Sequence, residues 1–193
     1  MIKPILFSTE MVRAILEGRK TVTRRDPFQT PPDYDVLKGH YRDSKGRLCA
    51  VFQCRKDLTT EAVYARYDRG DILWVRETWS RLETGPYLYK ADNEKPISYL
   101  GWRPSIHMPR EAARIFLRVT GVRVEKLRDM VLGDVLVEGI TEADTYESTW
   151  ERWHQTWNST IKPADHERYG WQANPWVWII QFERCEKPEG WPG

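Results

Sequence analysis

Cysteine is scarce in this chain of 193 residues, with single copies at positions 49, 54 and 185. An odd count without a Cys-x-x-Cys pair argues against a disulfide framework and against a cysteine-rich zinc site. Histidine is scarce too, and its four copies show no His-Glu-x-x-His or comparable metal-binding spacing. We therefore expect neither a metal ion nor another cofactor.

Long hydrophobic runs are also missing. No stretch reaches the roughly 18 apolar residues that a membrane-spanning helix needs. The opening segment MIKPILFSTE has too short an apolar run for a signal peptide. These absences predict a soluble protein of the cytoplasm with no membrane partner, and they leave its oligomeric state open.

The sequence lacks a strong excess of charge of either sign. It has 30 Lys and Arg residues against 28 Asp and Glu residues, for a net charge of only +2. Any nucleic-acid binding must therefore come from a local basic patch rather than from a global field. Because each phosphate contact needs a cation, this balance favours a small nucleoside over a long polymer as the partner.

Tryptophan, by contrast, is abundant, with ten copies. Large aromatic side chains supply buried area, and they also stack on nucleobases. Because tryptophan is highly buried on average, we expect most of the ten to be structural. This applies above all to Trp150, Trp153 and Trp157, which share one helical face.

The first 25 residues predict a strand, a helix and a second strand. Ile5–Phe7 is the first strand, and Ser8 or Thr9 can cap the helix that follows. Gly18 stands where a left-handed residue ends a helix. Thr21–Arg25 then alternates like a strand.

The middle of the chain combines one strong strand with two insertions. Residues 26–69 are polar and rich in turn residues, with RLCAVFQCR as a strand of a small hairpin. Gly70–Trp79 reads as a turn and a strand, and YLYKAD is expected to pair with it. Residues 80–110 form the second insertion.

The last third predicts strands, two helices and a final strand. RIFLRVTGVRVEKL reads as two strand segments broken at Gly121, and the helix LGDVLVEG ends at Gly139. Ser148 and Glu151 form a capping-box pattern that opens the next helix. The tail, about 186–193, is expected to be frayed.

NPWVWIIQFER is the last predicted strand. Its large apolar residues alternate toward one side, namely Trp176, Trp178, Ile180 and Phe182. Strands dominate the order of elements, and no βαβ unit repeats. The prediction is one α+β domain spanning 1–193, built on a small mixed β-barrel with short flanking helices.

EGRKTVTRR, from Glu17 to Arg25, places four cationic side chains and two threonines at the exit of the first helix. One interpretation is a solvated turn that leads into an exposed strand. The other is a site that holds an anion and acts on it.

Several segments resemble, in order, those of ASCH domains, which are relatives of the PUA-like RNA-binding fold. They are EGRKTVTRR, GDILWVRETW, RVTGVRVEKL, VLVEGI and PWVWIIQFER, and they cover most of the chain between Pro4 and Arg184. The likeness is densest in G-x-K-T-x-T-x-R, represented here by Gly18, Lys20, Thr21, Thr23 and Arg25. The two insertions resemble those of phage and prophage proteins, which implies a bacterial cell or a phage-infected host.

The resemblance implies a PUA-like barrel with a cleft beside the helix that carries the G-x-K-T element. Some bacterial members are amidohydrolases that remove the acetyl group from N4-acetylcytidine. Their proposed catalytic group, carried onto this sequence, falls on Lys20, Thr23 and Glu138.

Amide hydrolysis by such a group is chemically reasonable. Thr23 can attack directly, or Lys20 and Glu138 can activate a water. A lysine with an ordinary pKa of about 10.4 is protonated at neutral pH, so a basic Lys20 needs desolvation or a neighbouring cation. Arg24 and Arg25 would provide that charge. A plain ion pair between Lys20 and Glu138 is the alternative.

Further residues are candidates for substrate binding. Arg24, Arg25 and Arg76 can hold a carbonyl oxygen or a phosphate. Glu77 either points into the cleft or pairs with Arg76 or Arg118.

Three more candidates belong to the second insertion or its border. Trp79 and Trp102 would form a stacking wall for a base together with Tyr89, or else pack the insertion. His107 lies in the proline-rich loop PSIHMPR, a composition that suggests a ligand contact.

Three functions therefore remain open. The first is a hydrolase that cleaves an amide on a modified nucleoside. The second is a module that binds a modified nucleotide or single-stranded RNA or DNA without chemistry. The third is a metal-independent nuclease that uses a basic cleft.

Overall fold

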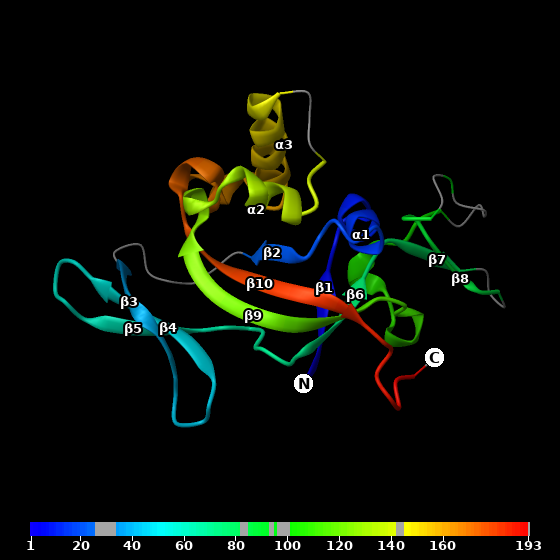
Figure 1. The fold of residues 1–193 in the computed structure, drawn as a ribbon, viewed down its shortest axis with the longest axis horizontal. Coiled ribbons are helices and arrows are strands. Elements are labelled where there is room, and N and C mark those ends of the chain that lie inside the picture. The colour runs from blue at the N-terminus through cyan, green and yellow to red at the C-terminus, as the bar shows by residue number, and fades with distance from the viewer. Residues whose placement is uncertain (26–33, 82–84, 93–94, 96–100, 142–144, 193) are drawn as a thin grey trace.

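A curved five-stranded sheet forms the centre of the molecule in the computed structural model (Figure 1). The structure describes all residues except 26–33, 82–84, 93–94, 96–100, 142–144 and 193. The strand order of the sheet is β1-β6-β9-β10-β2, with β1 and β6 parallel and the other neighbours antiparallel. Its strands are β1 (Ile2–Leu6), β2 (Val22–Arg25), β6 (Ile72–Arg76), β9 (Phe116–Lys126) and β10 (Trp176–Cys185).

The first helix forms at the predicted position. Along the chain it lies between β1 and β2, which are the two edge strands of the sheet. Helix α1 (Thr9–Leu16) is capped by Ser8, whose side chain accepts a hydrogen bond from the Met11 amide. Gly18 follows the helix with φ +77°, a left-handed conformation that glycine adopts without strain. The turn at Gly18 directs the chain into β2.

Strands β9 and β10 run side by side along the middle of the sheet. The predicted break at Gly121 is wrong, because β9 is one strand of 11 residues. Its register against β10 shifts between Gln181 and Phe182, opposite Gly121. A β-bulge absorbs one extra residue while the ladder continues, so the glycine marks a local irregularity rather than an end.

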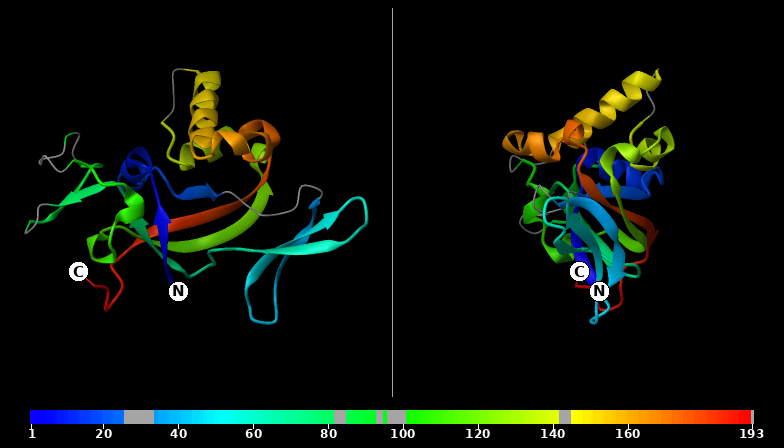
Figure 2. Two further views of the ribbon diagram at one scale, coloured as in Figure 1. Left: turned by 180° about the vertical axis from the view of Figure 1, so that it is seen from behind. Right: turned by 90° about the vertical axis from the view of Figure 1, so that its left-hand side faces the viewer.

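Two smaller sheets extend the molecule at opposite ends (Figures 1 and 2). The described part of the first insertion forms an antiparallel sheet of β3 (Tyr34–Arg42), β4 (Leu48–Cys54) and β5 (Thr60–Tyr64). At the other end, β7 (Trp79–Arg81) pairs with β8 (Tyr87–Tyr89). YLYKAD therefore pairs with the end of the predicted Gly70–Trp79 segment, where Tyr89 faces Trp79, and not with β6 itself.

The remaining helices lie together on the β2 side of the sheet (Figure 2). Thr145, not Ser148, caps α3, and Ser148 is the N3 member of the capping box. The helix thus begins one turn earlier than predicted, because two hydroxyl residues stand three apart and either can act as the cap. These helices are α2 (Leu132–Val137), α3 (Tyr146–Ser159) and α4 (His166–Tyr169).

The sheet separates two hydrophobic cores, and β10 contributes to both. Trp178, Ile180 and Phe182 enter the core under α1 and the small β3–β5 sheet. Val177 and Ile179 enter the second core, which α3 covers with Trp153, Trp157 and the neighbouring Trp150. The predicted alternation of β10 and the predicted tryptophan face are both confirmed.

The α+β class is confirmed, but the described strands form no closed barrel. The edge strands β1 and β2 exchange no ladder hydrogen bonds in the described part of the chain. The Arg25 guanidinium instead donates to the Leu6 carbonyl oxygen across the gap, at 2.7 Å. A side chain therefore bridges the position where a barrel would have a strand pair.

The C-terminal tail is anchored rather than frayed. Trp191 is 7% exposed, and its ring packs against Trp74 and Phe116 at centroid distances of 5.7 and 5.2 Å. Its indole N–H donates to the Arg110 carbonyl oxygen at 2.9 Å. The prediction failed because the composition of KPEGWPG indicates a loose end, whereas one large aromatic side chain is enough to fix it.

Replacing Trp191 by phenylalanine is expected to lower the free energy of unfolding by about 1–2 kcal/mol, because it removes this buried hydrogen bond. Denaturant unfolding measures the change. Trp102→Phe is the matched control, since the Trp102 indole nitrogen has no hydrogen-bond partner among the described residues. Equal losses in the two variants would show that the indole hydrogen bond of Trp191 contributes no stability.

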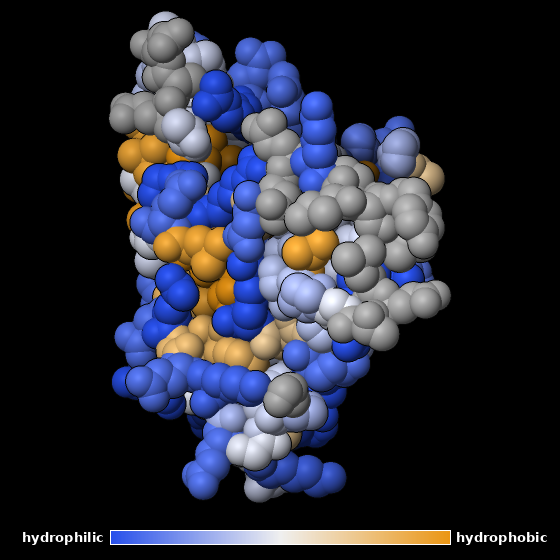
Figure 3. Space-filling view, turned by 90° about the vertical axis from the view of Figure 1, so that its right-hand side faces the viewer, coloured by the Kyte–Doolittle hydropathy of each residue, from blue (hydrophilic) through white to orange (hydrophobic). Residues whose placement is uncertain are grey.

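Large hydrophobic residues that reach the surface are scattered. The face on the β7–β8 side shows apolar patches interrupted by hydrophilic side chains (Figure 3). Isolated exposures of this kind, such as Ile106 and Val131, are ordinary on folded proteins. None of the described helices is both long enough and apolar enough to cross a membrane.

Candidate functional site

Lys20 is buried between the end of α1 and the end of α2, with 3% of its surface exposed. Its ammonium group donates three hydrogen bonds, to the carbonyl oxygens of Val22 and Glu138 and to Glu138 Oε2, at 2.7–2.8 Å. Lys20 and Glu138 also form an isolated antiparallel bridge, although they are 118 residues apart. The fold therefore brings this pair together as the resemblance implies.

Gly139 allows this close approach. It has φ +89°, and a Cβ atom added to it would lie 2.9 Å from Lys20 Cβ and 2.7 Å from Ala14 Cβ. Any larger residue would push α2 away from the turn after α1. The glycine that ends the predicted helix thus also sets the position of Glu138.

Glu138 binds both cations of the site through its two carboxylate oxygens. Oε2 faces Lys20 at 2.7 Å, while Oε1 accepts from the Arg24 amide at 2.7 Å and from Arg24 Nη1 at 3.2 Å. Arg24 is also 3.5 Å from Asp134, a residue of α2 that the sequence analysis did not single out. The site is therefore a buried network in which Glu138 contacts both Lys20 and Arg24, and Asp134 approaches Arg24 from α2.

The surroundings of Lys20 shift its pKa downward. Burial lowers the pKa of Lys20, and the nearby charges of Arg25 and Arg24 act in the same direction. The carboxylate of Glu138 opposes them by attraction and by hydrogen bonding. The result is a lysine whose pKa lies below its ordinary value, as a base would require.

Thr23 and the buried network line one cavity of about 250 Å³, which we call the Lys20 cavity. Thr23 is 4% exposed and borders this cavity. The cavity is lined by Leu6, Phe7, Ser8, Met11, Lys20, Thr23, Arg24, Arg25, Glu138, Trp153, Thr156, Trp157, Ser159, Thr160 and Ile161.

Trp153 is a cavity residue that the sequence analysis assigned only to the core. Its ring is 3% exposed, and its indole nitrogen has no hydrogen-bond partner among the described residues. Buried N–H groups are usually paired, so this unpaired donor is an exception in the wall of the cavity. Helical periodicity identifies the buried face but does not distinguish a core residue from one that borders a cavity.

Arg25 is held at the border of the Lys20 cavity. Its guanidinium lies over the Phe7 ring, 4.8 Å from the centroid, and bonds to the Leu6 carbonyl oxygen. Arg24 and Arg25 thus reach the site together, although neighbouring strand residues point to opposite faces of a sheet. Arg24 does so through its amide and its long side chain.

Arg76 and Glu77 lie elsewhere, near the β7–β8 hairpin. Arg76 donates to the Ile106 carbonyl oxygen and lies over the Trp74 ring. Glu77 is 1% exposed and pairs with Arg114 at 2.9 Å, not with Arg76 or Arg118 as expected. Burial raises the pKa of Glu77, and the contact with Arg114 opposes that shift.

The three aromatic and histidine candidates also lie apart from the Lys20 cavity. Trp79 is 5% exposed and packs on Tyr87, with the Arg103 guanidinium on its ring. Trp102 is half-buried, and His107 is exposed in a short helical turn. Among the described residues of the second insertion, none lines this cavity, so the expected wall is not part of it.

Searches with this chain found no match among models of protein families, among curated proteins or among solved structures. The arrangement of side chains is therefore the basis for any functional assignment. No group of three or more acidic, histidine or cysteine side chains is placed to hold a metal ion in the described residues.

Proposed function

We propose that this protein is a hydrolase of the ASCH type that cleaves an amide on a modified nucleoside, with N4-acetylcytidine as the model substrate. The supporting observation is that Lys20, Thr23 and Glu138 border one buried cavity, although Glu138 is 118 residues from Lys20. Sequence proximity does not bring these residues together. An unrelated surface turn would not require a lysine and a glutamate to meet away from water.

The proposed reaction adds water across an amide bond, releasing acetate and the free amino group of the base. Lys20 acts as the base in its neutral form, and Glu138 holds its amine in position and stabilises the ammonium that forms. Arg25 and the Trp153 indole N–H are donors that can stabilise the developing oxyanion. Each of these side chains lines the Lys20 cavity.

Two routes lead to the same products. Thr23 attacks the carbonyl carbon after Lys20 takes its proton, and the C–N bond then breaks as Lys20 returns that proton to the amino group of the base. Water hydrolyses the resulting threonine ester and releases acetate. Alternatively, Lys20 activates a water that attacks directly, and Thr23 only orients the substrate. Both routes place Thr23 beside the substrate, because Thr23 lines the same cavity as Lys20.

A binding module is the second candidate. The observation in its favour is that all three protons of the Lys20 ammonium are already used, by Val22 and twice by Glu138. In this alternative, the ion pair has a purely structural role and fixes the shape of the cavity. In that case the protein would bind a modified nucleotide or single-stranded nucleic acid without changing it.

A chromatographic screen of the purified protein against acylated cytidines tests the proposal. We expect conversion of N4-acetylcytidine to cytidine by the unmodified protein. Thr23→Ala should lower kcat/KM about 100-fold, whereas Thr23→Ser should stay within about tenfold because it keeps the hydroxyl.

Thr156→Ala is the matched control for Thr23. Thr156 lines the same cavity, but its hydroxyl donates to the Arg152 carbonyl oxygen within α3. This variant should keep its turnover. If no acylated cytidine is hydrolysed while cytidines still bind, the binding module becomes the better explanation.

A further inference from the structure

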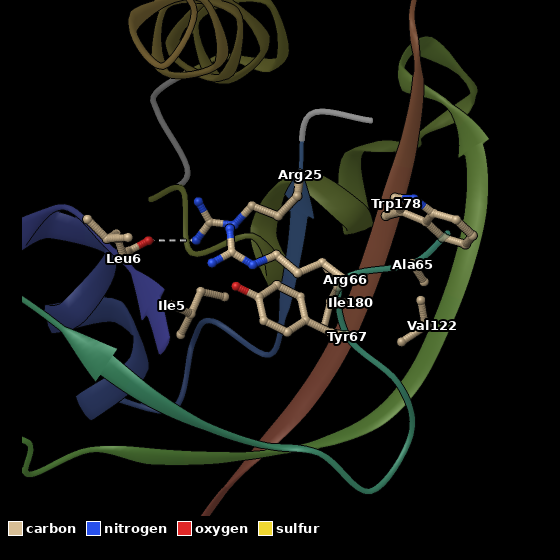
Figure 4. A pocket seen from close by; sticks show the side chains of 9 residues that line it. All are labelled: Ile5, Leu6, Arg25, Ala65, Arg66, Tyr67, Val122, Trp178 and Ile180. Atoms are coloured by element: carbon tan, nitrogen blue, oxygen red, sulfur yellow. Dashed lines mark hydrogen bonds between the residues drawn. The ribbon is translucent and has the colours of Figure 1, made fainter. Parts of the chain in front are cut away.

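A second cavity of about 230 Å³ lies beside the Lys20 cavity, and we call it the arginine cavity. It fills the gap between the two edge strands of the sheet, where β1 and β2 face each other without pairing. The segment after β5 covers it from the other side (Figure 4). The cavity is lined by Ile5, Leu6, Arg25, Ala65, Arg66, Tyr67, Val122, Trp178 and Ile180.

The cavity has a cationic end formed by two guanidinium groups. The side chains of Arg25, from β2, and Arg66, from the first insertion, lie next to each other there (Figure 4). Neither forms an ion pair with a carboxylate in the described part of the chain. Arg25 Nε is buried and has no hydrogen-bond partner among these residues.

Like charges at close range are unfavourable unless something negative offsets them. Burial lowers the pKa of Arg25, Tyr67 opposes this shift, and the charge of Arg66 adds a smaller decrease. Glu138 acts on Arg25 in the opposite direction, but its oxygens are already bonded to Lys20 and Arg24. Because a guanidinium stays protonated in proteins, the pair remains a doubly positive site without a carboxylate ion pair among the described residues.

We propose that Arg25 and Arg66 bind a phosphate group, and that the ligand of this protein is a nucleotide rather than a free nucleoside. Guanidinium groups match phosphate oxygens with two parallel hydrogen bonds, which makes paired arginines a common phosphate site. The nucleotide identity rests on the proposed function, whereas the anion site rests on the two arginines alone.

The dimensions of the two cavities agree with a nucleotide. Leu6 and Arg25 line both, so Arg25 stands at the boundary between them. Each cavity is smaller than the roughly 300–1,000 Å³ of typical ligand pockets, whereas the two together fall within that range. A base in the Lys20 cavity would thus place its phosphate at the arginine pair.

Calorimetric titration with cytidine, cytidine 5′-monophosphate and the dinucleotide CpC tests this proposal. We expect at least one phosphate-bearing ligand to bind about tenfold more tightly than cytidine, as charge-assisted hydrogen bonds produce. Arg66→Ala should abolish the difference. Tighter binding of the monophosphate alone indicates a site for a terminal phosphate. Tighter binding of CpC indicates a site for a phosphodiester within a strand.

Arg69→Ala is the matched control. Arg69 is exposed on the same segment and lines neither cavity, so its loss changes the net charge equally. It should leave the preference for phosphate intact. The proposal is overturned if cytidine and both phosphate ligands bind equally or not at all, or if Arg69→Ala removes the preference as fully as Arg66→Ala.

Arg66 is the better test residue because it is exposed and its removal should not disturb the fold. Arg25→Ala also removes the bond to Leu6 and the contact with Phe7. The titration needs no turnover. Phosphate binding without hydrolysis would reject only the proposed function, and hydrolysis with equal kcat/KM for nucleoside and nucleotide would reject only the phosphate site.

Discussion

Replacing Glu138 by alanine is expected to lower the free energy of unfolding by about 3–5 kcal/mol, because it leaves the buried Lys20 ammonium without its carboxylate partner. Glu138 is 2% exposed and is the carboxylate that both Lys20 and Arg24 contact. Its loss would leave the Lys20 ammonium without a carboxylate and the Arg24 guanidinium with Asp134 alone, at 3.5 Å, in a site that water scarcely reaches. Denaturant unfolding of the two proteins measures the difference.

A double variant separates the effect of the unpaired charge from the effect of lost side-chain packing. In the double variant Lys20→Met with Glu138→Leu, both members of the pair are apolar, so much of the stability should return. Glu183→Ala serves as the surface control. Glu183 is 63% exposed in a loose pair with Arg118 at 3.9 Å, and its loss should change stability by less than about 0.5 kcal/mol. If Glu138→Ala also changes the free energy of unfolding by less than about 0.5 kcal/mol, the buried network does not stabilise the fold.

Local patterns were sufficient to predict the elements that position the site. Alternation identified β10, and the cap at Ser8 together with Gly18 identified α1 and the start of β2. Gly139 likewise marked the end of α2. These signals depend on neighbours within a few residues, and the hydrophobic contacts of the fold reinforce them.

The predictions that failed depended on contacts between distant residues. A sheet closes or stays open according to how its edge strands meet, and neither β1 nor β2 carries that information alone. The anchor of the tail is a single side chain, Trp191, that finds Trp74 more than a hundred residues earlier in the chain. Glu77 found Arg114 instead of the arginines nearest to it in the predicted sheet.

The candidate site also combines residues that local patterns identify with residues that only distant contacts bring together. The lysine and the threonines of EGRKTVTRR are conspicuous in sequence, but only the family resemblance linked Glu138 to them. Arg66 had no signal at all, because a lone arginine in a polar insertion looks like surface. Its position beside Arg25 is evident only in the structure, where the segment after β5 lies across the gap between the edge strands (Figure 4).

Replacing Lys20 by methionine is expected to lower kcat by up to about 10⁴-fold if the proposed function is correct, because the general base is lost. Lys20→Arg should fail as completely, since a guanidinium does not give up its proton near neutral pH. A binding module predicts otherwise, because affinity carried by charge alone would largely survive in Lys20→Arg. Circular dichroism and a thermal unfolding curve must show that each variant is folded.

The dependence of turnover on pH is the more specific test of Lys20. Because burial lowers the pKa of Lys20, kcat/KM should rise with pH and reach its plateau below the ordinary pKa of lysine. Glu138 raises that pKa, so Glu138→Gln should move the rising limb toward lower pH, even though the folded fraction falls. If the rising limb of the kcat/KM profile does not move in Glu138→Gln, a group other than Lys20 is the general base. That result would reduce the contact between Lys20 and Glu138 to a structural ion pair.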